Sequence, residues 1–86
     1  MSTPPVQLLV TAPQLGQLLK AARKRQKLTQ AALGARLGLS QNRVSYLEQH
    51  ADDMSFKQLL AWCAVVGLDL HIALRQPVQP STQSEW

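Results

Sequence analysis

Side chains that both donate and accept hydrogen bonds are concentrated in residues 40–46, which read Ser-Gln-Asn-Arg-Val-Ser-Tyr. The carboxamides of Gln41 and Asn42 can each make two hydrogen bonds to the edge of an adenine, and the Ser45 hydroxyl can reach several kinds of base edge. Ser40 adds a further hydroxyl group. Tyr46 is a candidate to contact a thymine methyl or a phosphate, or to pack against the preceding helix. This chemistry predicts contact with DNA bases, although the same residue types also suit an ordinary solvated helix face.

Two short helices joined by a tight turn would position these side chains. Thr29 is the expected N-cap of the first helix, and Gly38 is expected to end it in the left-handed conformation. Ser40 is the expected N-cap of the second. A glycine in such a short turn brings the second helix steeply across the first, so that the polar side chains face outward. The inner positions are Leu33, Leu37, Leu39, Val44 and Leu47.

Basic residues are concentrated in the same half of the chain. Residues 1–47 contain seven Lys and Arg and no Asp or Glu, whereas residues 48–86 contain two basic and five acidic residues. The two halves therefore carry +7 and −3, which sum to the net +4 of the chain. This asymmetry favours a polyanionic partner. We expect Lys27, Thr29 and Arg43 to contact phosphates, together with the free N–H groups at the helix starts.

Two longer helices are expected to enclose this pair. The first should run over residues 12–26, with Thr11 as N-cap and Pro13 in its first turn. Residues 49–53 are polar and predict a loop. The last helix should open with a capping box of Ser55 and Gln58 and end at Gly67. Its expected buried stripe is Phe56, Leu59, Leu60, Cys63 and Val66, with Trp62 pointing away toward a dimer or partner surface.

The hydrophobic period changes to two after Gly67. Apolar residues then alternate with others, which predicts a strand with one buried face. The apolar positions are Leu68, Leu70, Ile72 and Leu74. A lone strand leaves backbone groups unpaired, so its partner should be either Val6–Val10 or the same strand of a second chain.

The segment 28–49, LTQAALGARLGLSQNRVSYLEQ, resembles the helix-turn-helix of phage-repressor-type (XRE/Cro-like) DNA-binding proteins, and the similarity extends over about residues 15–68. The resemblance implies an all-α core of five helices, with the fifth within residues 49–54. It implies that Gln30 contacts a phosphate and that Gln41 contacts a base. It also implies a structural ion pair between Arg23 and Glu48. Gly34 departs from the usual alanine, which either costs about 1 kcal/mol of helix propensity or permits close helix packing.

The remainder of the chain resembles HipB antitoxins through its length, the strand 68–74 after the helices, and a tail ending in Glu85-Trp86. This resemblance implies a homodimer closed by paired C-terminal strands, which represses its own operon and binds a HipA-like serine/threonine kinase toxin. Trp86 is then a candidate partner contact or protease-recognised tag. Two alternatives stay open: a stand-alone phage-type repressor without a toxin, and an interaction module that no longer binds DNA.

One small domain accounts for the length of 86 residues. We expect residues 1–10 to be a tail or short strand, 11–67 the helix-turn-helix domain, 68–75 the dimerisation strand and 76–86 a disordered tail. The single cysteine, the lack of a long apolar run and the lack of a signal peptide predict a soluble cytoplasmic protein. No arrangement of residues indicates an enzyme, a cofactor or a metal site.

Overall fold

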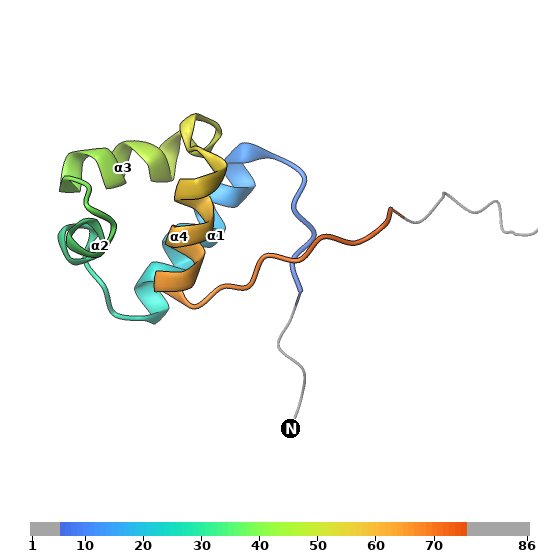
Figure 1. The fold of residues 1–86 in the computed structure, drawn as a ribbon, viewed down its shortest axis with the longest axis horizontal. Helices are drawn as coiled ribbons and strands as arrows, with labels where there is room; N and C mark the ends of the chain where they lie inside the picture. Colours follow the sequence, from blue (N-terminus) through green and yellow to red (C-terminus); the bar gives the residue numbers. More distant parts are fainter. Residues whose placement is uncertain (1–5, 76–86) are drawn as a thin grey trace, which may run out of the picture.

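The computed structural model describes residues 6–75, which form four α-helices and one three-residue 3-10 turn around a small core (Figure 1). The elements are α1 (Ala12–Arg25), α2 (Gln30–Leu37), α3 (Gln41–Gln49), η1 (Ala51–Asp53) and α4 (Phe56–Val66). The fifth helix of the expected fold is thus only the single turn η1. The predicted disordered tail and Trp86 lie outside the described residues.

The helix ends follow the predicted caps. Thr11, Thr29 and Ser40 each accept a hydrogen bond from the backbone N–H three residues on. Ser55 and Gln58 form the reciprocal capping box that opens α4. Gly38 and Gly67 end α2 and α4 with φ of 72° and 79°, a conformation that other residues adopt only with strain. Local sequence therefore sets where the four helices start and where α2 and α4 stop.

The core joins α1 to the crossed pair α2 and α3, with α4 packed against α1 and α2. Its buried members are Leu19, Ala22, Leu33, Val44, Leu47, Trp62, Cys63 and Val66. A Cβ at Gly34 would collide with the carbonyl oxygen of Leu39. The glycine in α2 therefore serves close packing between the helix and the following turn, the second of the two interpretations above.

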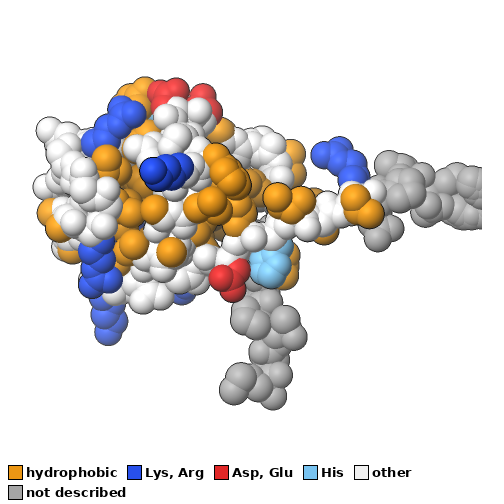
Figure 2. Space-filling model, in the orientation of Figure 1, with side chains coloured by type: hydrophobic (Ala, Val, Ile, Leu, Met, Phe, Trp, Pro, Cys, Tyr) orange, Lys and Arg blue, Asp and Glu red, His pale blue; other side chains and the backbone are white. Residues whose placement is uncertain are grey.

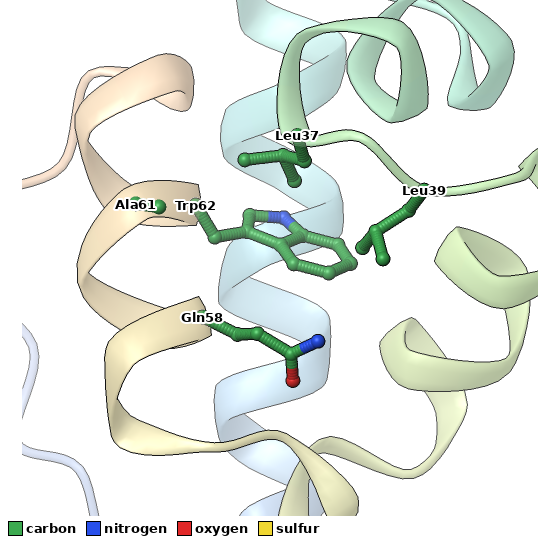
Figure 3. A pocket seen from close by; sticks show the side chains of 5 residues that line it. All are labelled: Leu37, Leu39, Gln58, Ala61 and Trp62. Atoms are coloured by element: carbon green, nitrogen blue, oxygen red, sulfur yellow. The ribbon is translucent and has the colours of Figure 1, made fainter.

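The predicted inner face of α4 was partly wrong. Phe56 and Leu60 are 62% and 47% exposed, whereas Trp62 is completely buried. Figure 3 shows the indole of Trp62 lying between Leu37 and Leu39, the residues on either side of the turn after α2. The crossing of α2 and α3 leaves a space there that a large side chain fills, so α4 is rotated to place Trp62 inward.

The segments that flank the helices form no strand within the described residues. Residues 6–10 and 68–75 run as irregular chain, and both border one hollow beside α1 and α4 (Figure 1). The strand predicted at 68–74 is absent from the single chain because no neighbouring strand pairs with it. Within residues 6–75, no helix combines the length and apolar character needed to cross a membrane.

Candidate nucleic-acid interface

The outer face of α3 presents most of the predicted base-contacting side chains. Gln41, Asn42 and Arg43 are exposed and Ser45 is half-buried, while Val44 and Leu47 on the opposite face are completely buried. The Ser40 hydroxyl accepts a hydrogen bond from the Arg43 N–H at 3.1 Å. It therefore caps the helix and retains its own hydrogen and a second lone pair for a further partner. Among the described residues, no hydrogen bond engages the side chains of Gln41, Asn42 or Ser45.

A buried ion pair fixes the inner side of α3 to α1, as the resemblance implied. Arg23 donates from Nε to Glu48 Oε2 at 2.6 Å and from Nη2 to Glu48 Oε1 at 3.2 Å. Both side chains are more than nine-tenths buried. Arg23 Nη1 also donates to the Leu28 carbonyl at 2.9 Å, near the end of the connection between α1 and α2. The pair thus ties three elements together at one point.

Gln30 makes a structural hydrogen bond and still has a free amide hydrogen for a ligand. Its Nε2 donates to Glu48 Oε1 at 3.1 Å, which adds α2 to the ion-pair network. The Gln30 amide has a second hydrogen, and the side chain is only half-buried. It can therefore hold Glu48 and still donate to a phosphate at the start of α2.

Tyr46 is held by partners that lie on α3 and η1. Its ring stacks on His50 with centroids 4.4 Å apart, and the Arg43 guanidinium carbon lies 5.2 Å from its centroid. Its hydroxyl donates to the Asp53 carboxylate. This hydrogen bond favours the neutral phenol and raises the pKa of Tyr46 above its usual value. Tyr46 is therefore held toward the C-terminal end of the outer face of α3, and the residue is 39% exposed.

The predicted phosphate contacts surround this face. Thr29 and Lys27 lie in the connection that opens α2, and the Thr29 hydroxyl accepts from the Ala32 N–H at 3.0 Å. Lys27 has φ of 58°, the one positive value at a non-glycine residue within 6–75. Arg23 is buried, so six of the seven basic residues of the N-terminal half remain exposed or half-exposed. Figure 2 shows Lys and Arg side chains at the top and at the bottom of the end of the domain that α2 and α3 form.

Sequence reasoning missed Gln49, which ends α3 and is exposed. It lies four residues after Ser45 and seven after Asn42, so the three side chains share one face of the helix. That spacing was the available signal, but residues 49–53 had been assigned to a loop. With Gln49 the outer face of α3 gains a third carboxamide.

Residues 14–75 match the family model of the helix-turn-helix domain. The match covers more than half of the chain, and the chain belongs to this family. A helix-turn-helix domain is the DNA-contacting module of regulatory proteins, so α2 and α3 define a DNA-binding regulator. No curated protein matches the sequence at significant similarity.

Proposed function

We propose that this protein is a sequence-specific transcriptional repressor that binds its operator DNA through the outer face of α3. The observation that carries the proposal is the division of α3 into two faces. Its inner face is buried and tied to α1 by Arg23 and Glu48, whereas its outer face carries free carboxamides. A recognition helix needs this combination, because base contacts demand exact placement of side chains that are not already engaged.

The roles divide by chemistry. Gln41, Asn42 and Ser45 are assigned to base edges, with Gln49 added from the structure. Ser40 contributes the free hydrogen and lone pair of its hydroxyl, and Tyr46 contributes its partly exposed side chain. Phosphate contacts are assigned to Lys27, Thr29, Gln30 and Arg43.

Lys27 gives independent support for the phosphate assignments. Glycine suits its left-handed backbone conformation better than lysine, which adopts it at a cost in stability. A lysine at that position is therefore consistent with use of its charge. It lies two residues before Thr29, the N-cap of α2, where helix N–H groups also favour an anion.

Binding to operator DNA tests the proposal. The DNA is obtained from the region upstream of the gene, or by selection from a random library. Gln41→Ala should weaken binding by about 5- to 140-fold and relax specificity at one base pair. Gln17→Ala is the matched control, because Gln17 is an exposed glutamine on α1 outside this face. Unchanged binding in Gln41→Ala, Asn42→Ala and Ser45→Ala would show that α3 does not read the operator. Weak binding that does not change with salt would favour the interaction module.

The operator-bound form is proposed to be a homodimer. Two copies would place their α3 helices in successive major grooves about 34–36 Å apart on a palindromic site. Support comes from apolar side chains that the single chain leaves in solvent. Ile72 and Leu74 are 90% and 96% exposed, and Phe56 and Leu60 form an exposed pair on α4. Figure 2 shows hydrophobic side chains over α4 and along the segment that follows it. Such a surface is typical of a protein interface.

Sedimentation measurements test the dimer. Ile72→Asp should give a monomer, because it places a charge on the apolar side of the segment 68–74. His71→Asp adds the same side chain on the polar side of the segment and should leave the dimer intact. Both positions are exposed in the single chain, so neither substitution disturbs the helical core. An Ile72→Asp protein that sediments as a dimer would exclude this segment from the interface.

The regulatory role is proposed to be that of an antitoxin in a type II toxin–antitoxin pair, repressing its own operon and binding a HipA-like serine/threonine kinase toxin. The support is the resemblance to HipB antitoxins over the segment 68–74 and the tail ending in Trp86. The test is co-purification with the product of the neighbouring gene, using wild type and Trp86→Ala. A neighbouring kinase-like protein that binds would support the antitoxin role. The absence of such a gene would favour the stand-alone repressor.

A further inference from the structure

The N-terminal segment Val6–Val10 is held against α1 by a single side chain. Gln14 accepts a hydrogen bond from the Val10 N–H at 2.7 Å and donates to the Leu8 carbonyl at 2.6 Å. In an extended chain, these two backbone groups point to the same side. The carboxamide of Gln14 therefore occupies one edge of the segment as a neighbouring strand would.

The opposite edge of this segment is open. In an extended chain, the N–H and C=O groups of Gln7 and Leu9 point away from the side that Gln14 occupies. The described structure gives these groups no backbone hydrogen bond. An apolar segment with one satisfied edge and one free edge is a template for addition of a strand. Val6, Leu8 and Val10 are each at least 75% exposed, so their side chains also lack apolar partners.

A broad hollow separates the segment Val6–Val10 from residues 68–75 of the same chain. Both segments line it, and its floor is formed by Leu15 and Leu18 of α1 and Cys63 of α4. The Leu68 N–H donates to the Cys63 carbonyl. Residues 69–75 make no backbone–backbone hydrogen bond within the described chain. The hollow is thus bordered on both sides by irregular chain with free backbone groups, and Leu15, Leu18 and Cys63 give it an apolar floor.

We propose that residues 68–74 of a second copy enter this hollow and pair on both sides. On one side they would pair with the same segment of the first chain, and on the other with the Gln7 and Leu9 edge of Val6–Val10. Two-fold symmetry repeats the arrangement and gives a four-stranded intersubunit sheet in which the N-terminal segments are the outer strands. This inference rests on the proposed homodimer and adds Val6–Val10 to its interface. The floor of Leu15, Leu18 and Cys63 is covered in the same step.

Residue-resolved amide hydrogen exchange tests the arrangement in the full chain. In the wild-type dimer, the Gln7 and Leu9 amides should exchange slowly and the Leu8 amide quickly. In monomeric Ile72→Asp, Gln7 and Leu9 should become fast, while Val10 keeps the protection that Gln14 provides. Fast exchange of Gln7 and Leu9 in a wild-type dimer overturns the inference and leaves the dimer standing. Protection that persists in the Ile72→Asp monomer also overturns it, because the pairing would then be within one chain.

A pair of proline substitutions gives a second measurement. Leu9→Pro removes an N–H that faces the hollow, and should weaken the dimer by about 5- to 140-fold because each dimer loses two hydrogen bonds. Leu8→Pro is the matched control, since its N–H lies on the Gln14 side and Gln14 does not use it. Gln7→Pro should act like Leu9→Pro without loss of an apolar side chain. Equal dimer affinity of Leu8→Pro, Leu9→Pro and Gln7→Pro overturns the inference. A monomeric wild type would instead refute the proposed dimer itself.

Discussion

Removal of Glu48 should destabilise the domain far more than the loss of one surface charge. Glu48→Ala leaves the Arg23 guanidinium buried, with Nε and Nη2 deprived of their acceptors and only the bond from Nη1 to the Leu28 carbonyl remaining. An uncompensated buried charge of this kind costs about 3–5 kcal/mol. A domain of this size loses about 4–8 °C per kcal/mol, so Tm should fall by roughly 12–40 °C.

Thermal denaturation followed by circular dichroism measures this loss, at one fixed protein concentration because the protein is proposed to dimerise. Gln49→Ala is the control, as an exposed neighbour on the same helix. Arg23→Met combined with Glu48→Met should recover most of the stability, since an apolar pair needs no hydrogen bonds. A loss of about 1 kcal/mol or less, or one that disappears in high salt, would show that the pair behaves as a solvent-exposed one and would refute the reasoning.

Three further outcomes follow from individual contacts. Lys27→Gly should raise Tm by relieving the left-handed backbone while weakening DNA binding and reducing the log–log salt slope by about 0.9, as measured by melting and a salt titration. Gly34→Ala should lower Tm, because the added Cβ meets the Leu39 carbonyl, even though alanine gains about 1 kcal/mol in helix propensity. The control is Ala35→Gly at an exposed position of α2, which should lose about 1 kcal/mol of stability by propensity alone. Asp53→Asn should lower the pKa of Tyr46 toward its usual value, since the carboxylate that favours the neutral phenol is removed. Tyr46 is the only tyrosine, so an ultraviolet titration reports it alone. An unchanged pKa of Tyr46 would contradict the hydrogen bond.

Features encoded within a few residues were predictable from the sequence. The caps Thr29, Ser40 and Ser55 and the stops at Gly38 and Gly67 depend on one side chain and the nearest turn of backbone. The inner positions of α2 and α3 were predictable for a related reason. The large apolar side chains of those helices lie on one side only, so hydrophobic periodicity identifies the inward side.

The orientation of α4 could not be predicted in the same way. Its sequence, FKQLLAWCAVV, is apolar on most of its circumference, so periodicity alone does not select the buried side. The choice depends on the space beside the turn at Leu37 and Leu39, which exists only after α2 and α3 have crossed. Trp62 fills that space, and Phe56 and Leu60 are turned outward as a result.

Contacts with a partner chain, or with a turn further along the sequence, could not be predicted from local sequence either. The bond between Tyr46 and Asp53 requires the η1 turn to bring the carboxylate back over the end of α3. The alternation in residues 68–74 predicts a strand that needs a neighbouring strand, and residues 6–75 of the single chain form none. Both cases concern long-range geometry and not residue chemistry.

The two faces of α3 have a consequence for how such a regulator can diverge. The side chains of Gln41, Asn42, Ser45 and Gln49 form no helix cap, ion pair or hydrogen bond within the described chain, whereas Val44 and Leu47 belong to the buried core and Glu48 to the buried ion pair. Substitutions on the outer face therefore leave the free energy of folding almost unchanged. After gene duplication, such a domain can acquire a new DNA target site through a few exposed substitutions, and each intermediate variant still folds.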